Sequence, residues 1–227
     1  MSNIVTLTMN PAVDMNTKIQ NVVAERKLRC EEPRYEPGGG GINVSRAIHR
    51  LGSESCAVYC SGGSFGTLLC NLLESENIST RSVEVEEQTR LNVSVYEETS
   101  EQQFRFTMPG PELKENEWQR VLDAIDQMSP KPSYIVASGS LPPGVPDDFY
   151  ARIARAAKKI GVKTILDTSK TSLRKALEEG VYLIKPNIRE LRQIAQRELE
   201  GDSEEEEFAK ELVSSGKSEV VVVSLGA

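Results

Sequence analysis

Four consecutive glycines, Gly38 to Gly41, lead into a predicted helix over Gly41–Leu51. Glycine allows backbone conformations and close approaches that a Cβ would prevent. The free N–H groups at the start of a helix, and its positive end, suit an anion or a group of hydroxyls. The spacing matches neither the dinucleotide-binding fingerprint nor the P-loop. Gly39, Gly40 and Gly41 are therefore candidates for holding a small polar ligand, and a purely structural turn is the alternative.

Polar side chains also follow two predicted strands. Asp14 comes shortly after the strand Ile4–Thr8, and Ser140 comes shortly after the strand Tyr134–Ala137. In parallel α/β sheets, ligands bind at the carboxyl ends of the strands. Asp14 is thus a candidate acceptor for sugar hydroxyls, with a turn or helix cap as the alternative. Ser140 adds a hydroxyl on a proline-rich loop.

Cations and further carboxylates extend this set. Lys27 and Arg90 are candidate phosphate ligands, although exposed cations are usually only solvated. Asn187 and Glu190 are three residues apart, so they share a face if a helix begins there. Glu190 would then hold Mg²⁺ while Asn187 faces phosphate oxygens, and Asp167, at the end of the preceding strand, would add a second carboxylate. Alone, this spacing more often marks the start of a helix.

The elements that must position these residues alternate between strand and helix. Strands separated by helix-length connections pair in parallel and place helices on both faces of the sheet. The sequence therefore predicts an α/β fold with a central, mostly parallel sheet between helices. Further strands are predicted at Cys56–Cys60, Lys163–Leu166, Val181–Ile184 and Val220–Val223, and further helices at Phe65–Glu76, Asp147–Lys159 and Glu204–Ser214.

One segment differs from this alternation. Leu91–Glu97 and Gln102–Met108 alternate polar and apolar residues around a short turn, which is typical of a β-hairpin. Thr17–Val22 and Arg34–Tyr35 are candidate partner strands. We expect a small antiparallel sheet that stands off the main sheet as a lid or as a dimer surface.

Composition excludes several functions. The chain has 227 residues, with 27 Lys and Arg against 34 Asp and Glu, so its formal net charge of −7 argues against nucleic acid or an anionic membrane as partner. The only histidine, His49, falls on the polar side of its helix, and the four cysteines lack zinc-site spacing, so zinc and catalytic-triad chemistry are not expected. Free cysteines and no export signal favour the cytoplasm.

The last predicted strand, Val220–Val223, is apolar on both faces, and only the helical stretch before it is available to cover it. An uncovered apolar strand at a sheet edge invites aggregation. From the sequence alone, we therefore expect residues 1–227 to form one incomplete domain, with lid strands within about 16–36 and 89–108.

Taken together, these motifs resemble the PfkB (ribokinase-like) family of sugar kinases over the whole chain and in the family order. The resemblance rests on five segments: Asn10-Pro11 with Asp14, Gly38–Asn43, Gly139–Gly144, Lys185–Glu190 and Ser224–Gly226. It implies that a sugar phosphate contacts Asp14, Lys27, Gly39, Gly40, Gly41, Asn43, Arg90 and Ser140. It also implies that ATP contacts Lys185, Asn187, Ser224 and Gly226, with Glu190 in the Mg²⁺ network.

Within the family, the Lys27–Cys30 segment and the four-glycine turn look most like members that phosphorylate fructose 6-phosphate to fructose 1,6-bisphosphate. Fructose 1-phosphate and tagatose 6-phosphate are the alternative acceptors, and a non-catalytic sugar-phosphate binder is the alternative of another class. The lid suggests a homodimer. The family's Gly-Ala-Gly-Asp motif, which supplies the catalytic base, does not occur in residues 1–227. We therefore assign no catalytic residue and expect residues 1–227 alone to be inactive.

Overall fold

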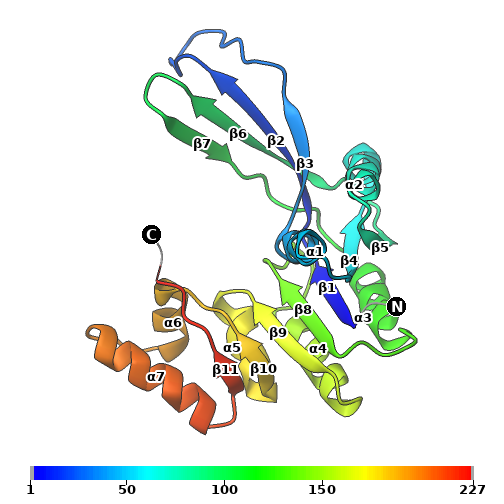
Figure 1. Ribbon diagram of the computed structural model, residues 1–227, viewed down its shortest axis with the longest axis vertical. Helices are drawn as coiled ribbons and strands as arrows, with labels where there is room; N and C mark the ends of the chain where they lie inside the picture. Colours follow the sequence, from blue (N-terminus) through cyan, green and yellow to red (C-terminus); the bar gives the residue numbers. More distant parts are fainter. Residues whose placement is uncertain (1–2, 226–227) are drawn as a thin grey trace.

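The computed structural model describes residues 3–225. Within them, a seven-stranded sheet has the strand order β11-β10-β9-β8-β1-β4-β5, and every neighbouring pair is parallel, as the alternating pattern predicts (Figure 1). Its strands are β1 (Ile4–Thr8), β4 (Cys56–Ser61), β5 (Ser79–Glu84), β8 (Tyr134–Ser138), β9 (Lys163–Asp167), β10 (Val181–Ile184) and β11 (Ser218–Val221).

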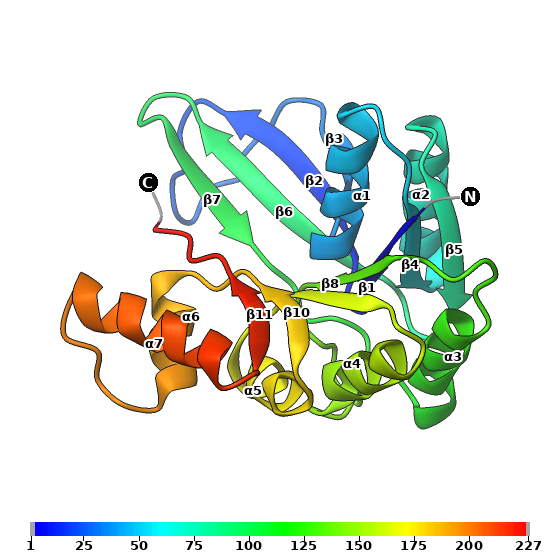
Figure 2. The same cartoon turned by 60° about the horizontal axis from the view of Figure 1, so that its bottom comes forward.

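Helices cover both faces of this sheet. Figure 2 shows α1 and α2 on one side and α3, α4 and α5 on the other, with α6 and α7 near β11. The helices are α1 (Gly40–Arg50), α2 (Gly63–Ser75), α3 (Glu115–Asp126), α4 (Phe149–Lys159), α5 (Lys170–Glu179), α6 (Ile188–Ala195) and α7 (Asp202–Ser214). The predicted α/β layering is therefore confirmed.

Strand β4 shows how one short segment serves both layers. Successive side chains of a strand point to opposite faces. Accordingly, Ala57 and Tyr59 belong to the apolar cluster under α1 and α2, whereas Val58 and Cys60 belong to the larger cluster on the other face. Burial raises the pKa of the Cys60 thiol to about 12, so this cysteine is a packing residue rather than a nucleophile.

A second, four-stranded sheet, which we call the lid, stands away from the main sheet with the order β3-β2-β6-β7 (Figure 1). It consists of β2 (Ala12–Ile19), β3 (Arg34–Gly38), β6 (Arg90–Glu97) and β7 (Gln102–Phe106). The predicted hairpin is present as β6 and β7. The lid is not wholly antiparallel, however, because β2 and β6 pair in parallel. Both of these strands leave the main domain outward, which makes their directions the same.

Two lid strands extend further toward the main domain than the sequence suggested. β2 starts at Ala12, directly after Pro11, rather than at Thr17, and β3 continues to Gly38. Asp14 therefore lies inside a lid strand and not in the loop after β1. The physical reason is pairing: residues from Ala12 onward gain partners on both β3 and β6.

The edge strand β11 covers Ser218–Val221, two residues earlier than predicted. Val221 and Val223 pack against the main core, whereas the Val222 side chain is 46% exposed. His49 is exposed on α1, as its helical position suggested. No helix within residues 3–225 is long and apolar enough to cross a membrane.

Candidate active site

The glycine turn brings the start of α1 against the carboxyl ends of β1 and β8. Gly39 has a φ of 123°, a conformation that favours glycine. A Cβ on Gly40 would lie 2.8 Å from the Ser138 carbonyl carbon, and a Cβ on Gly41 would lie 2.5 Å from the Leu7 carbonyl oxygen. The first turn of α1 can therefore approach both strands only without side chains.

Asp14 faces the glycine turn from the lid. The first glycine, Gly38, lies against its carboxylate, because a Cβ there would come within 2.6 Å of the Asp14 Cγ. Asn92, the register partner of Asp14 on β6, donates from Nδ2 to Asp14 Oδ1 at 2.8 Å. Within residues 3–225, Oδ2 accepts no side-chain hydrogen bond, so one carboxylate oxygen is available to a ligand. Sequence reasoning missed Asn92, because only strand pairing reveals it.

Arg90 is held by the backbone at the root of the lid. Its guanidinium donates to the carbonyls of Asn10 at 2.9 Å, Met108 at 3.2 Å and Pro11 at 3.4 Å. Burial lowers the pKa of Arg90 below its ordinary value, and the Asp14 carboxylate partly offsets that shift. Arg90 thus joins three segments of the chain, a structural role that the sequence did not indicate.

Ser140 lies on the loop after β8. The loop turns at Gly139, whose φ is 110°, and Tyr150 donates from its hydroxyl to the Gly139 carbonyl at 3.1 Å. Ser140 is an exposed residue, and its hydroxyl accepts a hydrogen bond from Asn10 Nδ2 at 3.3 Å. This places the hydroxyl close to the glycine turn, on the same edge of the sheet.

Asp167 connects the two halves of this edge. Its Oδ2 accepts from the Ser138 hydroxyl at 3.2 Å, and its Oδ1 lies 3.2 Å from Lys185 Nζ. Ser138 in turn lies against Gly40. These contacts connect Lys185, on the predicted nucleotide side, through Asp167 and Ser138 to the glycine turn.

Asn187 and Glu190 form the capping box that begins α6. Asn187 Oδ1 accepts from the Glu190 N–H, and Glu190 Oε2 accepts from the Asn187 N–H, both at 2.9 Å. Ser224 forms a parallel β-bridge with Asn187. In the structure this pair therefore begins a helix, which was the alternative to a ligand-binding role. In the part of the chain that the structure describes, no three acidic, His or Cys side chains gather to hold a metal ion.

Three predicted site residues remain: Asn43, Lys27 and Gly226. Asn43 is exposed on the first turn of α1, beside the glycine turn. Lys27 is exposed on the connection between β2 and β3, at the end of the lid far from the main domain (Figure 1). It therefore does not join the others within this chain. Gly226 lies outside the described residues.

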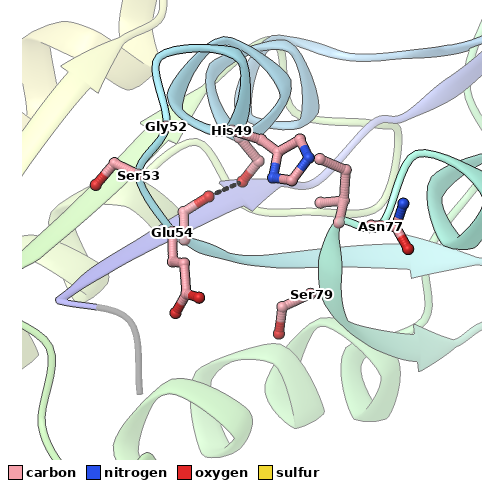
Figure 3. A pocket seen from close by; sticks show the side chains of 9 residues that line it. His49, Gly52, Ser53, Glu54, Asn77 and Ser79 are labelled. Carbon is pink, nitrogen blue, oxygen red and sulfur yellow. Dashed lines mark hydrogen bonds between the residues drawn. The ribbon is translucent and has the colours of Figure 1, made fainter.

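A polar cavity of about 390 Å³ opens elsewhere, at the amino ends of β4 and β5. Figure 3 shows His49 and Asn77 on its rim, with Ser53, Glu54 and Ser79 around it. None of the predicted site residues lines it, because it lies at the opposite edge of the sheet from the glycine turn.

The fold and the site define an α/β protein in which the glycine turn, Asp14 and Arg90 lie where a β lid joins the carboxyl edge of the main sheet. A family model described as "pfkB family carbohydrate kinase" matches residues 4–227. The chain belongs to this family of carbohydrate kinases.

Two curated relatives and one solved structure are similar over nearly the whole chain. ATP-dependent 6-phosphofructokinase isozyme 2 of Mycobacterium tuberculosis is 43% identical over 99% of this chain, and that of Escherichia coli is 42% identical over 100% of it. The crystal structure of the Escherichia coli phosphofructokinase-2 in complex with fructose-6-phosphate matches with a TM-score of 0.95, at 42% identity, over 100% of this chain and 75% of that one. The chain spans 66% of the Mycobacterium relative and 73% of the Escherichia coli relative.

The glycine turn gives a first testable prediction. Gly39→Ala should lower the free energy of unfolding by about 1–3 kcal/mol, because the new Cβ would lie 2.6 Å from Thr8 Cγ2 at a φ of 123°. Gly52→Ala is the matched control, since Gly52 also has a positive φ but a Cβ there meets nothing within 4 Å. Denaturant unfolding measures both. Equal losses would show that backbone conformation alone, and not close packing, requires glycine at position 39.

Proposed function

We propose that the intact protein is an ATP-dependent 6-phosphofructokinase. In this reaction the 1-hydroxyl oxygen of fructose 6-phosphate forms a bond to the terminal phosphorus of ATP, the bond from that phosphorus to ADP breaks, and the hydroxyl proton is released. The observation that carries the proposal is the placement of the Asp14 carboxylate. Asn92 donates to one of its oxygens at 2.8 Å, and Gly38, which has no side chain, lies against the other. The names of the 42–43% identical relatives support the choice of substrate.

The sugar side of the site offers acceptors and donors. Asp14 accepts hydrogen bonds from sugar hydroxyls, and the first-turn N–H groups of α1, at Gly40 and Gly41, lack acceptors within the helix. Asn43 and Ser140 add an amide and a hydroxyl at the same edge. Gly39 keeps this face free of side chains. These groups bind and orient the acceptor, which is the larger part of catalysis in phosphoryl transfer.

The nucleotide side is the edge formed by β9, β10 and the start of α6. Lys185 and Asn187 suit phosphate oxygens, and Ser224 lies beside Asn187 through its β-bridge. Mg²⁺ prefers a few carboxylates together with phosphate oxygens and water. Asp167 and Glu190 fit that donor set as single carboxylates near the phosphates. When bound, the ion would neutralise charge on the transferring phosphoryl group.

The four free cysteines, Cys30, Cys56, Cys60 and Cys70, suit a reducing compartment, so we also propose a cytoplasmic location.

The acceptor preference tests the proposed activity. With MgATP in excess, kcat/KM of the intact protein should be at least about tenfold higher for fructose 6-phosphate than for fructose 1-phosphate or tagatose 6-phosphate, which corresponds to about 1.4 kcal/mol of transition-state binding. A coupled assay for ADP release measures all three. A preference for either rival would replace the substrate. Binding without turnover of any of them would favour a non-catalytic binder.

Arg90 gives a second test of the site. Its contacts to three carbonyls leave part of its five-donor fork for a phosphate. Arg90→Ala should therefore raise KM for the sugar phosphate about tenfold or more, the effect of losing a charge-assisted hydrogen bond, while KM for ATP changes little. Arg50→Ala, at the exposed last turn of α1, is the control. If KM for both substrates rises together, Arg90 only holds the root of the lid.

We further propose a homodimer formed through the lid. Residues in register across all four lid strands form one apolar row: Tyr35, Met15, Val93 and Phe106. Tyr35 is 41% exposed and Phe106 is 51% exposed, so within this chain the row is only partly covered. The opposite face of the lid carries Asp14 and Asn92. A second copy of the chain, packing row against row, would bury the apolar residues and leave the ligand face of each lid free.

Light scattering of the intact protein tests this assembly. We expect a dimer mass at micromolar concentration, and Phe106→Glu should shift it toward the monomer because the charge would be buried in the interface. Gln103→Glu adds the same charge to the same strand but on the opposite face, so it should keep the dimer mass. A monomeric wild-type protein, or equal effects of both substitutions, would contradict a dimer built on this row.

A further inference from the structure

Asn10 lies where three parts of the chain meet, although no ligand contact was assigned to it. It falls between β1 and β2 and is 8% exposed. Its carbonyl accepts from Arg90 Nη2 at 2.9 Å, and its Nδ2 donates to Ser140 Oγ at 3.3 Å. Gly110, on the segment that returns from the lid, packs against the amide, because a Cβ there would come within 2.7 Å of the Asn10 Cγ.

The other end of the Asn10 amide is unusual. Its Oδ1 is buried and has no hydrogen-bond partner among the described residues. A buried acceptor without a donor is unfavourable. With the amide reversed, Oδ1 would accept the Ser140 proton, and Nδ2 would instead be buried where Oδ1 now lies. The orientation of this one amide therefore decides which way the hydrogen bond to Ser140 runs.

The direction of that bond matters for Ser140. A hydroxyl has one proton to donate and can accept at its lone pairs. Because Asn10 Nδ2 donates to the Ser140 oxygen, the Ser140 proton is free for another acceptor. Ser140 is exposed at the sugar edge, on the loop that Gly139 turns. Its free proton is thus available to an oxygen of the bound sugar phosphate.

We propose that Asn10 is a positioning residue for the sugar phosphate, which acts by holding the Ser140 hydroxyl as a hydrogen-bond donor toward the substrate. This inference rests on the proposed function, since it takes Ser140 as a ligand of the sugar phosphate. Asn10 itself need not touch the substrate. Its effect on binding must then pass through Ser140.

A double-mutant cycle tests that dependence. Asn10→Asp keeps the shape of the side chain but offers Ser140 a carboxylate acceptor, which would attract the Ser140 proton away from the substrate. In the intact protein, Asn10→Asp should raise KM for the preferred sugar phosphate about five- to tenfold, the range for one hydrogen bond, and change KM for ATP less than about twofold. In a Ser140→Ala background, the same substitution should change KM for the sugar phosphate less than about twofold.

Two further variants keep the test decisive. Asn71→Asp places the same charge change on the exposed face of α2 and should leave both KM values unchanged. Asn10→Ala removes the donor without adding a charge. It serves if Asn10→Asp fails to fold, and it should show a smaller sugar-phosphate effect of about two- to fourfold that also vanishes in the Ser140→Ala background.

The outcomes separate this inference from the proposed function. Wild-type turnover with any of the three sugar phosphates keeps the kinase assignment, whatever the variants do. If the wild type is active but the effects of Asn10 and Ser140 simply add, or if KM for ATP rises equally, the positioning role of Asn10 is wrong and the amide only supports the fold. A wild-type protein that neither binds nor phosphorylates any of the three overturns both proposals.

Discussion

The close approach of the α1 N-terminus to β1 and β8 is the constraint on which the site depends. Gly40 and Gly41 meet the backbone of Ser138 and Leu7 at distances that leave no room for a Cβ. The Ile42 N–H donates to the Thr8 hydroxyl at 2.9 Å and fixes the helix in this position. As a result, N–H groups that have no acceptor within the helix, and its positive end, face the carboxyl edge of the sheet, where the strands place the other polar groups.

The lid is attached to this edge by short polar contacts rather than by a large apolar interface. Arg90, at the start of β6, donates to the backbone carbonyls of Asn10, Pro11 and Met108. Within residues 3–225, the lid residues that pack into the apolar cluster under α2 are Val13 and Leu91, at the base of the lid. Gly38 ends the lid strand β3 and Gly40 begins α1, so the glycine turn itself connects the lid, which carries Asp14, to the main domain.

Several polar groups that we propose as ligand contacts also have a structural use. Glu190 caps α6, and Asp167 joins Ser138 to Lys185. Internal partners of this kind hold a side chain in one orientation before a ligand arrives. This preorganisation reduces the ordering that binding requires.

The sequence alone determined the α/β class, the parallel main sheet, the lid hairpin and the glycine turn, because each depends on local periodicity or on residue types a few positions apart. It did not determine the pairing of Asp14 with Asn92, of Arg90 with Asn10 or of Asn10 with Ser140, since these pairs lie 78, 80 and 130 positions apart along the chain. Tertiary structure also decided that β2 and β6 run parallel and that Asp14 lies within a strand. Strand pairing sets these features, and pairing between distant segments leaves no local pattern in the sequence.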